Sequence, residues 1–177
     1  MKRVNIDIAD FNSAVFDDLN SNWMLLTAGT KEKFNFMTVS WGLLGTFWFR
    51  PVVMVGVRPQ RYTFEFIEDN STITLAAFPA EYKEQLFFCG RNSGRDYDKV
   101  AESGLTVIDS DKVEAPAFDE AELIIEARIV YTDSLRGKNF KDKKIIPKIY
   151  EARDFHKLYF AEVVNISGTE KYIKQRG

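Results

Sequence analysis

Two hydroxyl side chains, Thr38 and Ser40, lie close together in a stretch that is largely apolar. The segment NFMTVSWGLLGTFWFRP, residues 35–51, contains Thr38 and Ser40 but no acid and a single charge. In a β-strand, the two-residue period would place Phe36, Thr38 and Ser40 on one face. Hydroxyls beside an aromatic ring suit a flat heteroaromatic ligand, whose edge needs hydrogen bonds and whose rings need stacking. The alternative is a structural strand whose hydroxyls face water.

A second group of residues has the composition of an anion site. In the segment RPQRYTFEFI, a strand is expected to end at Arg58, a helix to begin near Thr63, and Arg61 lies between them. A helix start presents unpaired N–H groups and a partial positive charge, so two arginines and a hydroxyl beside it would suit a phosphate. Alternatively, the turn is solvated and Thr63 only caps its helix.

The segment CGRNSGRDYDK offers a similar combination. Backbone N–H groups around Ser93 and Gly94 would form a concave anion site, with Arg95 adding positive charge. A structural interpretation is equally open. Ser93 would then start a helix in a capping box with Asp96, and Arg95 would pair with Asp98.

The chain has one histidine and one cysteine. His156 precedes a strand-like run, where an isolated histidine is either a hydrogen-bonded structural residue or a functional one. Cys89 is expected to be a small buried hydrophobic residue and not a nucleophile. With a single histidine, neither a multi-histidine metal site nor a conventional hydrolytic triad is expected, and we predict no bound metal.

The 177 residues are expected to form one domain, residues 1–177, because no repeat, linker or low-complexity tract divides them. A formal net charge of −2 does not indicate a nucleic-acid partner. No apolar run approaches the roughly 20 residues of a membrane helix, and the N-terminal residues lack the apolar core of a secretion signal. We therefore expect a cytoplasmic protein that binds neither nucleic acid nor a membrane.

Short strand-like runs dominate the pattern, and an aromatic share of 14% also favours strands. Many short strands with few helices predict a mainly β protein, an antiparallel barrel or sandwich. Strands are predicted at residues 23–30, 36–42, 52–58, 72–78, 105–109, 122–133 and 157–168. Helices are predicted at residues 62–70, 79–92 and 93–104, and a solvated basic loop at residues 136–144.

Taken in chain order, four segments resemble the flavin reductase-like family and, within it, the flavoredoxin-type branch. They are NFMTVSWG, RPVVMVGVRPQRYTFEFI, CGRNSGRDYDK and DFHKLYFAEV, which lie within residues 22–166. The P-loop and the Gly-rich dinucleotide fingerprint are both absent from the sequence. The resemblance implies the FMN-binding split barrel, an antiparallel Greek-key β-barrel with a few helices, working as a homodimer with FMN near the subunit interface.

The resemblance also implies the residues of the site. His156 would be the catalytic residue, near the flavin face where a nicotinamide or substrate arrives. The implied cofactor-binding residues fall into three groups: Thr38, Val39, Ser40 and Trp41 at the ring edge; Arg58, Tyr62 and Thr63 at the ribityl phosphate; and Ser93, Gly94, Arg95 and Lys99 as a second set of flavin contacts.

The implied activity is transfer of hydride or electrons from NAD(P)H to flavin, or onward to an acceptor. The cofactor would supply the chemistry, while the protein supplies position and electrostatic tuning. One alternative is a non-enzymatic FMN-containing electron-transfer protein, which takes electrons from a redox protein partner. Another is a barrel that carries a different apolar ligand and no flavin.

Overall fold

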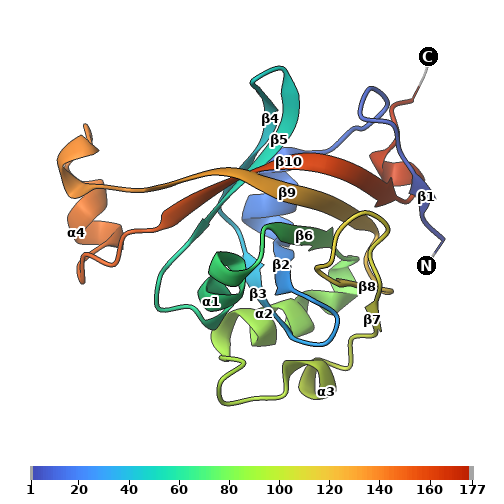
Figure 1. Cartoon of the computed structure of the whole chain (residues 1–177), viewed down its shortest axis with the longest axis horizontal. Coiled ribbons are helices and arrows are strands. Elements are labelled where there is room, and N and C mark those ends of the chain that lie inside the picture. The colour runs from blue at the N-terminus through green and yellow to red at the C-terminus, as the bar shows by residue number, and fades with distance from the viewer. Residues whose placement is uncertain (1, 176–177) are drawn as a thin grey trace.

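The computed structural model describes residues 2–175, and its main element is an antiparallel sheet curled into a barrel (Figure 1). The strands of this sheet are β1 (Val4–Asn5), β2 (Met24–Gly29), β3 (Phe34–Val39), β4 (Gly42–Phe47), β5 (Arg50–Val57), β6 (Thr72–Ala77), β9 (Leu123–Ser134) and β10 (Lys157–Gly168). Their order is β3-β2-β6-β9-β10-β5-β4, with β1 paired to β10. The prediction of a mainly β, antiparallel protein is confirmed.

The barrel is open along one line. Strands β3 and β4 are consecutive in the chain, joined by Ser40 and Trp41, yet they occupy opposite ends of the strand order. Within residues 2–175, no ladder pairs them. We call this unpaired line between β3 and β4 the seam.

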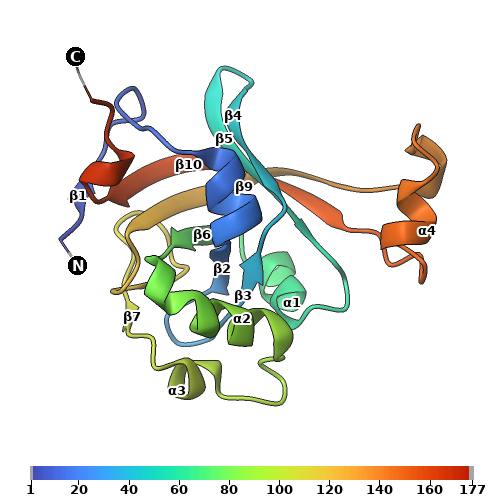
Figure 2. The same ribbon diagram turned by 180° about the vertical axis from the view of Figure 1, so that it is seen from behind.

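The sheet is covered on both faces, which explains why its central strands are continuous apolar runs and not alternating ones. Along β2, the side chains of Met24 and Leu26 enter the barrel core, while Leu25 packs on the other face with Phe36. Figure 2 shows α1 and α2 beside this part of the sheet. The helices are α1 (Tyr62–Asp69), α2 (Lys83–Arg91), α3 (Lys99–Ser103) and α4 (Ile145–Ile149).

Strands β9 and β10 extend well beyond the barrel and carry α4 at their far end (Figures 1 and 2). We call residues 131–156 the arm. Its tip has an aromatic cluster of its own, in which the rings of Phe140 and Phe155 both contact Tyr150, with centroid distances of 5.7 and 4.9 Å. The basic segment 136–144 runs along the arm largely exposed, as predicted for a solvated loop.

Each predicted strand coincides with an observed one, although residues 105–109 contribute only β7 (Val107–Ile108), which pairs with β8 (Ala117–Phe118). Strand β4 was not predicted. This strand forms the outer edge of the open sheet, where Leu43, Phe47 and Trp48 beside it are exposed. An edge strand with apolar residues on its solvent side lacks the polar alternation that marks a half-buried strand. No helix in the described part of the chain has the length and apolarity required to cross a bilayer.

Two predicted helix caps are wrong. Helix α1 begins at Tyr62 without a side-chain cap, so Thr63 is inside the helix. Ser93 does not start α3 either, because residues 93–96 form a turn and the side chain of Asp98 caps the helix by accepting from the N–H groups of its first turn. Gly104, the last residue of the predicted helix, follows α3 in the left-handed conformation typical of a helix end.

Candidate functional site

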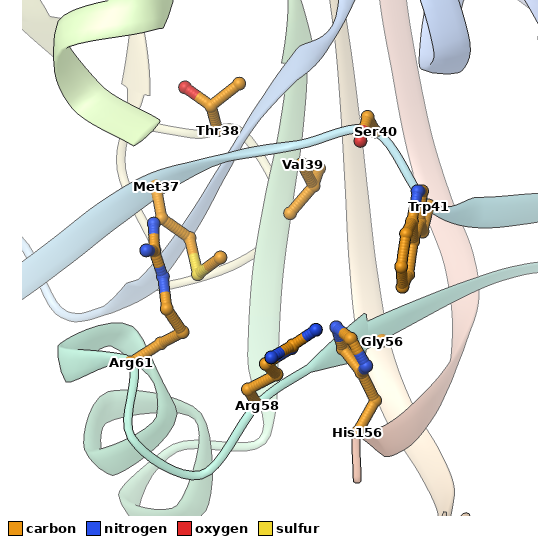
Figure 3. Close-up of a pocket in the computed structure, with 9 residues that line it drawn as sticks. All are labelled: Met37, Thr38, Val39, Ser40, Trp41, Gly56, Arg58, Arg61 and His156. Carbon is orange, nitrogen blue, oxygen red and sulfur yellow. The ribbon is translucent and has the colours of Figure 1, made fainter. Parts of the chain in front are cut away.

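Two adjoining pockets lie at the seam and beside it. The first, of about 250 Å³, lies where the chain leaves β3 at Ser40 and Trp41, between the end of β3 and the end of β5, and is called the seam pocket (Figure 3). The second, of about 210 Å³, lies between the start of α1 and the loop after α2 and is called the cation pocket. Met37 and Arg61 line both pockets, so the two form one bent site.

The structure brings every predicted site residue to this bent site. The seam pocket is lined by Thr38, Val39, Ser40, Trp41, Arg58 and His156 from the predicted set. The cation pocket is lined by Tyr62, Thr63, Ser93, Gly94, Arg95 and Lys99. Segments that are far apart in sequence therefore meet, because the turn after β5, the loop after α2 and the end of the arm all converge beside β3.

The hydroxyls of Thr38 and Ser40 differ in their surroundings. Thr38 points to the side opposite Met37 and Val39 (Figure 3), and its hydroxyl donates to the carbonyl of Leu86 in α2. The expectation of a hydroxyl face turned to a ligand is therefore corrected for Thr38. The Ser40 hydroxyl has no hydrogen-bond partner within residues 2–175, and it lines the seam pocket. Ser40 thus remains the available donor on this wall.

His156 lies at the same end of the seam pocket as Trp41, and the two rings are neighbours (Figure 3). The two rings are 5.1 Å apart, and the imidazole lies over Gly56, where a Cβ would meet it at 3.4 Å. The Nδ1 atom of His156 is hydrogen-bonded to the hydroxyl of Tyr150 at 2.8 Å. The pKa of His156 is lowered to about 4, mainly by burial and to a smaller extent by the charge of Arg58. The ring is therefore neutral at neutral pH.

Arg58 lines the seam pocket, whereas Tyr62 and Thr63, with which the resemblance grouped it, line the cation pocket. Its guanidinium is ion-paired with Asp154 and donates to the carbonyl of Ile149 at 2.9 Å. The side chain therefore lines the seam pocket beside His156 and fastens the arm to the barrel. The nearby Arg61 occupies the junction of the two pockets instead.

The start of α1 forms one wall of the cation pocket. No side chain caps this helix, and the backbone N–H groups of Tyr62 and Thr63 have no acceptor within residues 2–175. The Thr63 hydroxyl is occupied, because it accepts from the side-chain amide of Asn35 at 2.6 Å. The helix start therefore offers backbone donors and its dipole to an anion.

Lys99 is a buried cation at the base of the cation pocket, with 4% of its surface exposed. Its ammonium donates to the carbonyls of Phe36 and Cys89, the latter at 2.8 Å, and it has no carboxylate partner in the described part of the chain. Burial lowers the pKa of Lys99 to about 8, and the charge of Arg61 acts in the same direction. An anion in the pocket would compensate this charge.

Other cations surround the same space. Arg61 donates to the carbonyl of Gly90 at 2.6 Å and, like Lys99, forms no ion pair within residues 2–175. Arg95 lies over the ring of Tyr62 at 4.7 Å and pairs with Glu65, so the predicted pair with Asp98 is wrong. The charged residues that line the pocket are Arg61, Arg91, Arg95, Lys99 and a single acid, Asp96.

Some residues of the site were not predicted. Gly56 could have been predicted from the sequence, because a glycine inside a strand often marks the close approach of another group. Here that group is the ring of His156. Asn35 buries its amide beside Gly94, and only the fold brings these two together. Nothing in the sequence indicates that Tyr150 belongs to the site, because its position beside His156 depends on how the arm folds back to the barrel.

The sequence was also compared with known protein families and with individual proteins. Residues 16–175 match the family model described as the flavin reductase like domain. The chain is 29% identical over 107 residues to an uncharacterized protein of Archaeoglobus fulgidus, a match that spans 60% of this chain and only 59% of that protein.

Solved structures give the same result for the fold. A flavoredoxin of Methanosarcina acetivorans superposes with a TM-score of 0.66 at 22% identity, covering 96% of this chain and 75% of that one. An FMN-binding protein of Thermus thermophilus with bound p-hydroxybenzaldehyde has a TM-score of 0.64 at 17% identity, covering 84% and 72%. The predicted split-barrel fold is confirmed, and the chain belongs to the flavin reductase-like family.

Proposed function

We propose that this protein binds FMN across the two pockets, with the isoalloxazine ring in the seam pocket and the phosphate in the cation pocket. The observation that carries the proposal is the chemical difference between the two ends of one continuous site. One end has the rings of Trp41 and His156 and the free hydroxyl of Ser40, while the other has the unpaired cations Arg61 and Lys99. A ligand with a flat heteroaromatic ring and an anionic tail fits both ends.

The residues that would hold the phosphate are the backbone N–H groups of Tyr62 and Thr63, the guanidinium of Arg61 and the turn at Ser93 and Gly94. Lys99 would attract the phosphate through its charge and not through a direct hydrogen bond, because its ammonium already donates to two carbonyls. Its buried surroundings screen this charge poorly. The same charge costs free energy when nothing compensates it, so anion binding and folding support each other here.

When bound, FMN would supply hydride and electron transfer between a reduced nicotinamide and an acceptor. This chain's own residues would orient the ring, exclude water and provide hydrogen-bond donors at its edge. Ser40 and the backbone of residues 38–41 would contact the ring, and the exposed Trp41 with His156 would border the space for a second substrate. We therefore propose an NAD(P)H-dependent flavin oxidoreductase.

A homodimer is the assembly that we propose for this function. Aromatic side chains gather on the exposed side of the β4–β5 hairpin, where Trp48 lies 6.0 Å from Tyr131 and 6.2 Å from Phe160. Phe49 at the tip is fully exposed, at 102%. An apolar surface of this kind at an open sheet edge favours pairing with a second copy. Sedimentation velocity at several concentrations tests it.

A second candidate function is a flavoprotein reduced by a redox protein and not by a nicotinamide. The arm favours it, because exposed basic side chains run along it, and these suit an acidic electron carrier. They are Arg136, Lys138, Lys141, Lys143, Lys144 and Lys148. Reduction of the FMN-loaded protein by such a carrier, with no reduction by NADH or NADPH, would select this function.

Binding of FMN is tested with a matched pair of variants and two ligands. Titration of FMN and riboflavin into the flavin-free protein, followed by flavin fluorescence, separates the phosphate from the ring. Arg61→Ala should weaken FMN binding by about tenfold to a hundredfold and leave riboflavin unchanged. Arg128→Ala is the control, because this exposed arginine on β9 lines neither pocket. Equal affinity for FMN in all three proteins would contradict the assigned phosphate end.

Turnover is tested separately. The FMN-loaded protein should oxidise NADH or NADPH under anaerobic conditions, with bleaching of the flavin absorbance. If FMN binds tightly but neither nucleotide reduces it, the proposed flavin site stands and the proposed reductase activity is rejected. Failure of the wild-type protein to bind FMN or riboflavin would reject both candidate functions.

A further inference from the structure

Tyr150 connects the arm to the seam pocket. Although it belongs to the projecting part of the chain, only 4% of its surface is exposed, because Phe140 and Phe155 cover its ring. Its hydroxyl lies 2.8 Å from Nδ1 of His156, and the two rings stand at 78° to each other. Tyr150 therefore contacts the imidazole of the one histidine in the sequence through a directed side-chain hydrogen bond.

The direction of this hydrogen bond follows from the surroundings. Within residues 2–175 the Tyr150 hydroxyl has no hydrogen-bond partner besides His156, so its proton is satisfied only if it donates to Nδ1. Burial raises the pKa of Tyr150, which keeps the hydroxyl protonated. A neutral imidazole that accepts at Nδ1 must carry its own proton on Nε2.

The charged groups near His156 do not favour the imidazolium form. Arg58 and Asp154 are the charged residues that act on the ring, and they are paired with each other. Arg58 also lies over the ring of Tyr150 at 5.4 Å from its centroid. A second positive charge on His156 would stand beside this guanidinium, so the neutral ring is the stable state.

We propose that Tyr150 is a positioning residue, which holds His156 as a neutral Nε2–H donor aimed into the seam pocket at a carbonyl oxygen of the second substrate. The inference rests on the proposed flavin function, because it needs a second substrate beside the ring. The Nε2 atom has no partner within residues 2–175, and the imidazole lines the pocket beside Trp41 (Figure 3). A carboxamide or an aldehyde presents the acceptor that such a donor recognises.

The hydrogen bond itself is tested in the flavin-free protein. Because the chain has a single histidine, long-range ¹H–¹⁵N correlation spectra report His156 without assignment. The proton is expected on Nε2 at pH 7, with protonation of the ring only in acid. Tyr150→Phe should move the nitrogen shift of Nδ1 and raise the pKa of His156 toward its ordinary value. Phe140→Leu, which alters the arm but leaves the hydroxyl, is the control.

A proton found on Nδ1 would overturn the proposal, as would a Tyr150→Phe spectrum identical to that of the wild-type protein. Neither result depends on flavin. The positioning role is therefore judged even if the protein fails to bind FMN, in which case the proposed function alone is rejected.

The consequence for recognition is tested in the FMN-loaded protein with two probes, p-hydroxybenzaldehyde and nicotinamide, followed by changes in the flavin spectrum. Tyr150→Phe should weaken binding by about fivefold to tenfold, while the affinity for FMN stays unchanged. An equal loss for both probes would show recognition of a shared carbonyl oxygen, and a loss for one would identify which carbonyl His156 contacts. Unchanged affinity for both would contradict the proposal.

Discussion

Gly94 lies so close to Asn35 that a Cβ added to it would stand 2.1 Å from Oδ1 of that asparagine. Asn35 is buried and donates to the Thr63 hydroxyl at 2.6 Å, so its side chain has no room to withdraw without losing this bond. Gly94→Ala should therefore lower the free energy of unfolding by about 1–2 kcal/mol and weaken FMN binding. Urea unfolding and FMN titration measure the two effects.

Gly45→Ala is the matched control for this change. A Cβ on Gly45 would meet nothing within 4 Å, and the residue lies in a strand, away from both pockets. We expect no loss of stability or of FMN affinity. If both glycine variants behave alike, the close packing of Gly94 on Asn35 is not important for the site.

Lys99 should make stability depend on pH in the alkaline range. Its pKa is about 8 in the folded protein, whereas an unperturbed lysine has a pKa of 10.5, so the unfolded chain binds more protons between these values. The free energy of unfolding should therefore rise as the pH increases from 8 to 10.5. Urea unfolding at several pH values should show this rise in the wild-type protein and not in Lys99→Met. A rise of equal size in both would reject the buried charge as its origin.

The same group predicts how flavin binding depends on pH. A phosphate near Lys99 stabilises the charged ammonium, so binding should raise its pKa and take up protons above pH 8. The affinity for FMN should then fall as the pH increases beyond 8, while the affinity for riboflavin changes little. Isothermal titration in buffers of different ionisation enthalpy measures the proton uptake directly. Release of protons on binding would be incompatible with this arrangement.

The tip of the β4–β5 hairpin should be a site of stored strain. Trp48 and Phe49 both have positive φ values, 53° and 58°, a conformation that asparagine and glycine tolerate and bulky residues do not. Trp48→Asn combined with Phe49→Gly should raise the free energy of unfolding of the monomer by about 1–2 kcal/mol. Because the aromatic side chains are lost, the same variant should associate more weakly in sedimentation experiments. A variant that is less stable as a monomer would speak against strain at this turn.

The ion pair between Arg58 and Asp154 should fasten the base of the arm. Asp154→Asn removes the charge that Arg58 and Gln60 both contact, so hydrogen exchange should quicken in residues 145–156 while the barrel strands keep their protection. Glu151→Gln is the control, since this exposed carboxylate has no ion-pair partner in the described part of the chain. Equal exchange in the two variants would show that the arm is held by its aromatic contacts alone.

Much of the fold could be predicted because its strands are locally distinct. Runs such as residues 72–78 end at polar or turn-forming residues, and burial on both faces makes them predominantly apolar, with Thr72 and Thr74 as buried exceptions. Strand β4 was not predicted because side chains on its exposed face, such as Leu43 and Phe47, are apolar, so the strand lacks the alternation of apolar and polar residues.

The site could be predicted in its segments but not in its atomic roles. Glycines, arginines and hydroxyls beside helix starts identified turns that the structure brings together at the two pockets. The hydrogen-bond partner of each side chain could not be predicted in this way. Thr38 donates to a carbonyl of α2, and Arg58 pairs with an acid of the arm. These partners are separated by 48 and 96 positions, and only the tertiary structure decides which of several polar groups they meet.

The arm has an implication for how such proteins diversify. It is cohesive through its own aromatic rings and touches the barrel at few points, so insertions and exchanges there would leave the barrel core undisturbed. Exchange of this one hairpin would therefore change the surroundings of the seam pocket, while the cation pocket, which contains no residue of the arm, would be unchanged.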